Sequence, residues 1–310
     1  MKKTLLFSLL LVASLPLWAQ QDPMYSQYMF NGLVLNPAYA GSREAINITA
    51  LHRTQWVGIP GAPTTTTFSA HAPVKKDNIG LGLIFVNDRI GVTETNNIGF
   101  NYAYMLKMRK GVLSLGLQAS VMQYRADFAS VVHNFSPDVF DPSFASVVNR
   151  WLPNFGTGAY YRTDRFYVGL SVPNILTNNL NGETNVAFIG NNRARQYRHA
   201  FLTSGYVFDI TKGLKLRPSF LLKYVDGAPL ELDLNANLWL YDMFAVGLSY
   251  RSFDSIDALF EFQVTPQLSL GYAYDYTLTP LGKYTSGTHE IMIRYEFGFG
   301  KSRIITPRYF

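Results

Sequence analysis

Few residues of this chain have the types and spacing that chemistry would need. The five histidines are scattered, and none lies at metal-ligand spacing from another: His52, His71, His133, His199 and His289. His289 and Glu290 begin the zinc-protease pattern, but Ile293 stands where its second histidine would be. The absence of cysteine excludes thiol catalysis, disulfides and thiolate-bound metals. We therefore expect no metal site.

Phosphate-binding and nucleophilic motifs are missing as well. Gly300-Lys301-Ser302 resembles the end of a phosphate loop, yet Tyr295 stands where that loop needs its first glycine. The sequence has no G-x-S-x-G elbow. Paired carboxylates such as Glu290 and Glu296 are expected to be wall charges that face a lumen. A lone Ser–His pair, as in barrel lipases, is the enzymatic alternative that the sequence leaves open. We expect a protein with neither enzymatic activity nor a cofactor.

The composition is that of a folded, charge-poor protein. Of 310 residues, 48% are hydrophobic, 15% aromatic and 15% charged, whereas average usage is about 25% charged. Disordered tails lack such aromatic content. Without the two lysines of the N-terminal leader described next, the formal charge is 25 − 21 = +4. This small charge gives no reason to expect a nucleic-acid partner.

Residues 1–19 have the organisation of a cleaved signal peptide. Two lysines precede an apolar run from Leu5 to Leu17, and the expected cleavage follows Ala19. The run is short for a membrane-spanning helix, which needs about 20 residues. A buried N-terminal helix is the alternative. We expect the chain to leave the cytoplasm.

Apolar and polar residues alternate with period two along most of the remaining chain. Ile291, Ile293 and Tyr295, for example, alternate with Arg294 and Glu296. Strand side chains point to opposite faces in turn, so such segments are half-buried strands. Fourteen segments show the pattern: residues 45–54, 64–74, 78–87, 95–107, 111–124, 154–163, 165–173, 197–209, 213–225, 230–240, 243–251, 256–265, 267–277 and 288–299.

The connections distinguish a membrane barrel from a soluble sandwich. Every second connection is tight, as at 163–164 and 241–242. The others are mostly longer: 55–63, 88–94, 125–153, 174–196, 226–229, 252–255 and 278–287. Short turns on one side and long loops on the other are typical of outer-membrane barrels, whose strands close because lipid cannot hydrogen-bond a sheet edge. We expect an all-β, antiparallel transmembrane β-barrel of about 14 strands over residues 45–299, located in the outer membrane.

The two faces of the barrel wall are expected to differ. A charge that faces mid-bilayer lipid costs about 2–4 kcal/mol, so the charged faces should point inward. The inward set is Lys215, Arg217, Lys223, Glu231, Asp233, Glu261, Asp275, Arg294 and Glu296. Aromatic residues near strand ends are expected to form interfacial girdles: Tyr104, Trp239, Tyr241 and Phe244 at the short turns, and Tyr124, Tyr224, Tyr250 and Tyr276 at the long loops. An ordinary aromatic core is the alternative.

Both ends of the mature chain offer candidate contact surfaces. In the N-terminal signature segment, residues 20–44, the stretch 21–42 lacks clean alternation and is expected to form either a periplasmic lead-in or a plug. Their candidate partner-binding residues are Tyr25, Tyr28, Met29, Phe30, Asn36 and Pro37, for which packing against the barrel wall is the alternative. In the tail, residues 300–310, the basic candidates are Lys301, Arg303 and Arg308. Solvated surface charge is the alternative for the tail. Both termini are expected in the periplasm.

Several short blocks resemble one protein family. The blocks are Gln21-Asp22-Pro23, Ser26-Gln27-Tyr28-Met29-Phe30-Asn31, Asn36-Pro37-Ala38-Tyr39-Ala40-Gly41, Arg53-Thr54-Gln55-Trp56-Val57-Gly58 with Pro60-Gly61-Ala62-Pro63, Tyr272-Ala273-Tyr274-Asp275, Gly287-Thr288-His289-Glu290-Ile291 and Pro307-Arg308-Tyr309-Phe310. Together they look like the PorP/SprF family, which comprises outer-membrane proteins of the type IX secretion system in the Bacteroidota. The Asn-Pro-Ala triplet alone is less specific, since FadL-type channels carry a similar one.

The resemblance implies a function that composition does not. Family members work with periplasmic ring and lipoprotein components of the secretion machine. Some pair with a secreted surface adhesin and help to export or hold it, including in gliding motility. A FadL-like or porin-like diffusion channel is the alternative. The loops 125–153 and 174–196 are expected outside the cell, where they either narrow the lumen or bind cargo.

Overall fold

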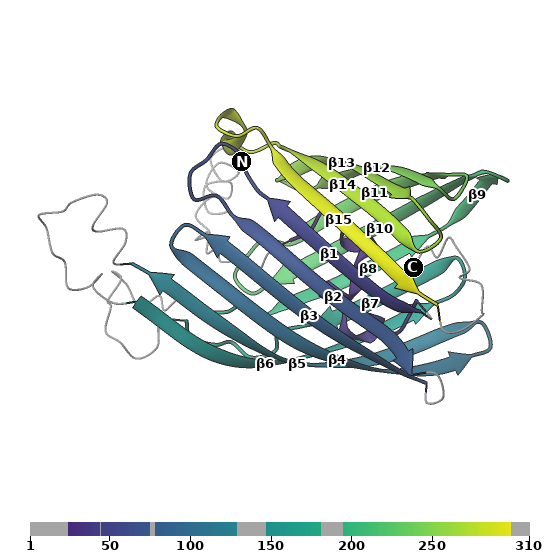
Figure 1. The fold of residues 1–310 in the computed structure, drawn as a ribbon, viewed down its shortest axis with the longest axis horizontal. Coiled ribbons are helices and arrows are strands. Elements are labelled where there is room, and N and C mark those ends of the chain that lie inside the picture. Colours follow the sequence, from purple (N-terminus) through teal and green to yellow (C-terminus); the bar gives the residue numbers. More distant parts are fainter. Residues whose placement is uncertain (1–23, 44, 75–77, 129–146, 181–194, 299–310) are drawn as a thin grey trace, which may run out of the picture.

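The wall of the molecule is one closed antiparallel β-barrel. The computed structural model describes residues 24–43, 45–74, 78–128, 147–180 and 195–298. Consecutive strands pair, except that β8 and β9 both pair with β10; β1 pairs with β15, and a pairing between β10 and β11 completes the ring. Figure 1 shows the strands crossing the barrel obliquely. No helix in the described part of the chain is long and apolar enough to cross a bilayer.

The observed strands follow the predicted order. Their bounds are β1 Ile46–Thr54, β2 Thr64–Val74, β3 Ile79–Ile90, β4 Thr93–Met108, β5 Gly111–Asp127, β6 Val147–Arg162, β7 Phe166–Val172, β8 His199–Tyr206, β9 Phe208–Thr211, β10 Leu214–Val225, β11 Glu231–Leu240, β12 Phe244–Arg251, β13 Ser255–Gln263, β14 Leu268–Thr277 and β15 Thr288–Phe297. The prediction of an all-β antiparallel transmembrane barrel is confirmed.

One predicted strand, residues 197–209, is divided. Strands β8 and β9 both pair with β10, and they are separated by Val207. The buried Val207 directs its N–H to the carbonyl of Arg165 at 2.8 Å, while the register with β10 stays the same on both sides of it and shifts only between Leu214 and Lys215. Because β8 and β9 share one position in the wall, fifteen strands make fourteen wall positions.

Two connections, predicted at 88–94 and 125–153, are shorter in the structure than predicted. Strand β3 runs to Ile90 and β4 begins at Thr93, with Gly91 at φ +54° in the tight turn between them. Strand β6 begins at Val147, and its Pro153 pairs with Val121 of β5. These strands continue past the apolar alternation, where polar pairs such as Asn87–Glu94, at 2.8 Å, replace it. The prediction stopped where the apolar pattern stopped, although strand pairing did not.

The wall separates apolar from charged side chains as expected. Large apolar side chains are exposed on the outer face, among them Phe68, Leu83, Phe100, Leu117, Phe155, Leu170, Leu248 and Ile291. Of the predicted inward charges, Lys215 and Glu231 are half-buried and the rest are buried. Trp239 and Tyr124 were assigned wrongly to the girdles. Both are buried on the inner face, because they share the strand parity of Asn237 and Ala126.

The two ends of the barrel carry different connections. At the short-turn end, connections such as 109–110, 163–165 and 241–243 are tight. At the long-loop end, the connections include 55–63, 226–230 and 278–287, the last of which contains the 3₁₀ helix η5 (Pro280–Lys283). Residues 129–146 and 181–194 of the long predicted loops, with His133, lie outside the described residues.

Candidate functional site

Residues 24–43, here called the lumen segment, lie inside the barrel. The segment contains three short 3₁₀ helices, η1 (Tyr28–Phe30), η2 (Gly32–Val34) and η3 (Pro37–Tyr39). Almost all its side chains are buried, and they form two apolar clusters with inward-facing wall residues. The segment was expected to be either a periplasmic lead-in or a plug, and in the structure it is a plug inside the barrel.

The lumen segment runs from the long-loop end to the short-turn end. Its first described residue, Met24, borders a cavity with Trp56 and Phe253, both of which belong to long-loop connections. Gly41 lies against Pro73 and Gly80, beside the short-turn connection of β2 and β3. The chain then leaves the lumen and begins β1 at the short-turn end. The segment therefore spans much of the barrel's length.

A buried ionic network holds the first turn of the lumen segment. Arg53 contacts Asp275 at 2.8 Å and Glu290 at 3.1 Å, and all three side chains are at most 3% exposed. Glu290 accepts the backbone N–H groups of Ser26 and Gln27 at 3.0 and 2.8 Å. Removing one member of a buried ionic set typically costs about 3–5 kcal/mol. The two carboxylates thus pair with Arg53 and also accept hydrogen bonds from the lumen segment.

The same network links blocks that are far apart in sequence. Ser26 donates its hydroxyl proton to Asp275 at 2.7 Å and accepts a hydrogen bond from Arg53 at 2.8 Å. Ser26, Arg53, Asp275 and Glu290 come from four of the sequence blocks that carry the family resemblance. Their common role is to anchor the lumen segment to the β1, β14 and β15 wall.

Two further arginines hold the carbonyl groups of η1. Arg217 of β10 donates to the Met29 carbonyl at 3.1 Å, and Arg294 of β15 donates to the Phe30 carbonyl at 3.3 Å. The Arg294 guanidinium also pairs with Glu261 on β13. These carbonyls end a helix of three residues and lack partners within it. The cations satisfy them from two strands of the wall that β11 to β14 separate.

Asn36 and Pro37 begin η3 and fix it to the wall. The Asn36 side chain accepts the Ala38 N–H at 2.9 Å, which makes it the helix N-cap, and Pro37 occupies the first turn. The Asn36 amide also donates to the carbonyl of Ala159 at 3.0 Å. One side chain therefore both starts the helix and ties it to β6.

Glycines of the wall admit the second half of the segment. A Cβ on Gly116 would lie 2.1 Å from the Ala38 nitrogen, and one on Gly158 would lie 2.1 Å from the Asn36 Oδ1. Neither distance is possible for real atoms in contact. These glycines on β5 and β6 let the segment's backbone approach the sheet closely.

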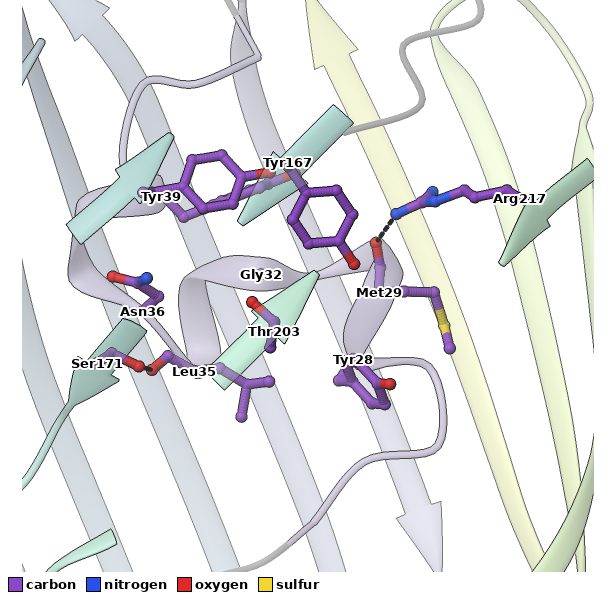
Figure 2. Close-up of a pocket in the computed structure, with 11 residues that line it drawn as sticks. Tyr28, Met29, Gly32, Leu35, Asn36, Tyr39, Tyr167, Ser171, Thr203 and Arg217 are labelled. Carbon is purple, nitrogen blue, oxygen red and sulfur yellow. Dashed lines mark hydrogen bonds between the residues drawn. The ribbon is translucent and has the colours of Figure 1, made fainter. Parts of the chain in front are cut away.

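Packing between the segment and the β7, β8 and β10 wall is tight. A cavity of about 30 Å³ remains there, lined in part by Tyr28, Tyr39, Tyr167 and Arg217. A cavity needs roughly 10–15 Å³ by this measure to hold one water molecule, so the space is no larger than a water or two. Figure 2 shows the side chains that line this cavity, with Arg217 donating to the Met29 carbonyl at 3.1 Å and Ser171 donating to the Leu35 carbonyl at 2.6 Å.

A larger cavity of about 480 Å³ lies at the long-loop end. It is lined by Met24, Gln55, Trp56, Pro63, Asp88, Ile90, Pro229, Leu230, Glu231, Arg251, Ser252, Phe253 and Asp254. Volumes of roughly 300–1,000 Å³ are typical of small-molecule sites. Among the described residues, no group of His, Cys, Asp or Glu could hold a metal ion. We call this space the mouth cavity.

The structure locates only some of the candidate residues. Tyr25, Tyr28, Met29, Phe30, Asn36 and Pro37 are all buried within the lumen, where they contact the wall. Lys301, Arg303 and Arg308 lie outside the described residues. From the sequence we expected Asp275 and Glu290 to be ordinary wall charges, and we assigned no role to Arg53 or Arg251. Asp275, Glu290 and Arg53 could have been found from the sequence, because each lies on the inward face of its strand and within a block that resembles the family.

Comparisons with known proteins bear on the whole barrel. The family model "Type IX secretion system membrane protein PorP/SprF" matches residues 17–295. No curated protein matches the chain significantly. The chain is 13% identical to the "CymD monoaromatic hydrocarbon channel", with a TM-score of 0.48 over 91% of this chain and 95% of that one. It is 9% identical to the P. putida toluene transporter TodX, with a TM-score of 0.47 over 88% of this chain and 95% of that one. It is 11% identical to the Acinetobacter baumannii outer membrane protein Omp33, with a TM-score of 0.43 over 83% of this chain and 100% of that one.

Proposed function

Since the chain belongs to the PorP/SprF family of type IX secretion system membrane proteins, we propose that it acts by protein–protein contact. In this proposal, the barrel helps to export a secreted cargo protein, such as an adhesin, or to attach it at the cell surface, including in gliding motility. Its other partners are outer-membrane lipid and the periplasmic ring and lipoprotein components of the machine. No catalytic step is assigned to it.

The occupied lumen is the observation that supports this proposal over a diffusion channel. The lumen segment is anchored by Arg53, Asp275 and Glu290 at one end and packed against Gly116 and Gly158 further along. A channel for hydrophobic or small solutes would have to move this segment or pass beside it. A contact protein gains a rigid wall from the same arrangement.

The orientation of the barrel follows the usual asymmetry of outer-membrane barrels. We place the short-turn end and the basic tail in the periplasm and the long-loop end at the cell surface. The tail residues Lys301, Arg303 and Arg308 would then face an acidic periplasmic partner. For the N-terminal side, the position of Met24 at the long-loop end favours the cell surface over the periplasm expected from the sequence.

Affinity purification tests the proposal. The tagged protein is purified from native outer membranes in mild detergent, and co-purifying proteins are identified by mass spectrometry. We expect enrichment of periplasmic ring proteins, a lipoprotein or one large surface adhesin. A barrel that purifies alone or with a small hydrophobic molecule would contradict the proposal and favour the channel.

Two variants assign the contacts to parts of the chain. Charge reversal of Lys301, Arg303 and Arg308 should reduce recovery of the periplasmic partner, and unchanged recovery would remove the tail from the proposal. Deletion of residues 21–36 should reduce cargo export. Normal barrel assembly with unchanged export would show that the segment has no functional role.

A further inference from the structure

The mouth cavity combines features that fit one kind of partner. We propose that it is a surface-facing docking site for a basic segment of a secreted or surface-attached polypeptide, with Met24 in its wall. The proposal rests on the proposed function, because it takes the long-loop end to be the cell-surface end. It adds to that function the place where cargo binds and the chemistry that recognises it.

Charge around the cavity is unbalanced. Carboxylates in its lining and in the layer beneath are Asp88, Glu231, Asp233, Asp254, Asp257, Asp275 and Glu290, and the cations are Arg53, Lys223 and Arg251. Seven carboxylates therefore face three cations. Arg251 alone lies within 4 Å of four of these carboxylates. A cationic side chain entering from the mouth would reduce this excess of negative charge.

The rim of the cavity is apolar as well as acidic. Phe253, Leu230 and Ile90 all line it and are 84%, 53% and 48% exposed. Trp56 and Phe253 adopt the left-handed backbone conformation, with φ of 47° and 64°, which is uncommon for bulky residues. Exposed aromatic and aliphatic anchors around a pocket are typical of protein-binding sites.

These features select a polypeptide segment as the occupant. A volume of about 480 Å³ holds a few side chains and excludes a folded domain. The carboxylates among the described residues do not form a metal-binding group, so an organic cation fits them better than a metal ion. A lysine or arginine flanked by apolar residues would match both the acidic layer and the apolar rim.

Single-cysteine labelling tests the position of the site. The chain contains no cysteine, so only the introduced residue can react with the label. A membrane-impermeant maleimide is added to intact and to permeabilised cells. Phe253→Cys should label in intact cells and Met24→Cys should label in the barrel purified without cargo, whereas Lys110→Cys, in a short turn, should label only after cells are permeabilised. If Phe253→Cys labels and Met24→Cys is protected even in the purified barrel, the docking proposal fails alone. If Lys110→Cys labels and Phe253→Cys does not, the orientation in the proposed function fails.

Peptide binding tests the chemistry. Acetylated, amidated Leu-Lys-Leu and Leu-Glu-Leu peptides are titrated against the purified barrel in detergent micelles by thermophoresis. The lysine peptide should bind about fivefold or more tightly at low salt, since each exposed charge pair contributes up to about 1 kcal/mol. High salt should narrow this difference. Equal binding of the two peptides, or no binding of the lysine peptide at millimolar concentration, would overturn the proposal.

A matched pair of variants locates the effect. Asp254→Asn, at the mouth, should reduce the preference for the lysine peptide. Asp209→Asn, at the short-turn end, should leave it unchanged, although both carboxylates pair with an arginine and are 42% exposed. Equal effects of the two variants would attribute the preference to overall charge and remove the mouth cavity as the site.

Discussion

The two halves of the lumen segment are held in different ways. Residues 24–31 are bound by charged side chains of the wall, chiefly Arg53, Glu290 and Arg294. Residues 32–40 instead lie close to wall backbone at positions such as Gly116, and a buried ion pair between Arg43 and Glu296 holds the segment where it leaves the lumen. The first half therefore depends on ionic groups that water could solvate, whereas residues 32–40 depend on shape. Movement of the segment is expected to begin at the long-loop end.

Breaking the ionic anchor should have the largest effect. Arg53→Met leaves Asp275 and Glu290 buried without their cation, which should lower the free energy of unfolding by about 3–5 kcal/mol. Urea unfolding in detergent micelles, followed by tryptophan fluorescence, measures the change. Trp239 reports on the segment because it belongs to the same buried cluster as Tyr25 and Tyr28.

An exposed ion pair provides the control for that variant. Arg89 contacts Glu94 at 3.0 Å, but its side chain is 63% exposed, so Arg89→Met should cost at most about 1 kcal/mol. Adding Asp275→Asn and Glu290→Gln to Arg53→Met should recover part of the lost stability. Equal effects of Arg53→Met and Arg89→Met would show that the buried network does not anchor the segment.

Adding one methyl group tests the half that depends on shape. Gly116→Ala places a Cβ 2.1 Å from the Ala38 backbone nitrogen, so the segment must shift, at a cost of about 1–3 kcal/mol. In Gly99→Ala the nearest atom is the Gln118 side-chain nitrogen at 3.3 Å, and little change is expected. The same urea titration, with heat-dependent migration on gels, compares them. Equal stability of the two variants would contradict close packing at Gly116.

The N-cap of η3 should have a smaller effect. Asn36→Ala removes the acceptor for the Ala38 N–H and the donor to the Ala159 carbonyl, and caps are worth about 0.5–2 kcal/mol. Asn36→Ser keeps a capping acceptor and loses the amide donor, so it should be intermediate. Urea midpoints of the three proteins give the order. A serine variant no better than alanine would show that the wall contact, and not the cap, fixes this turn.

The sequence predicted the wall far better than its contents. Strands such as β14 were predicted to within one residue, because lipid outside and polar lumen inside impose period-two alternation. The start of β6 was missed by seven residues, since Pro153 and the polar residues before it interrupt that alternation while pairing continues. Alternation of apolar and polar residues indicates which face of the wall a residue is on. It does not indicate where the hydrogen-bonded pairing of two strands ends outside the membrane.

The candidate site depended on contacts that no local pattern contains. Arg53 and Glu290 are 237 residues apart in sequence and meet only because β1 pairs with β15. Tyr28 and Asn36 were predicted as partner-binding residues, and in the structure they contact Asn235 on β11 and Ala159 on β6. The irregular lumen segment has no period of its own, so two alternatives for its path stayed open until its contacts with the wall were known.

The smallest expected effect separates hydrogen bonding from packing at the start of the segment. The buried Tyr25 hydroxyl lies 2.7 Å from the Thr67 hydroxyl, and a hydrogen bond of this kind contributes about 0.5–1.5 kcal/mol. Tyr25→Phe keeps the ring in its apolar cluster and removes that bond, so it should cost less than Arg53→Met. Tyr274→Phe removes an exposed bond to the Ser286 carbonyl and serves as the control. If Tyr25→Phe destabilised the protein as much as Arg53→Met, the hydroxyl and not the ionic network would be the main anchor of the first half.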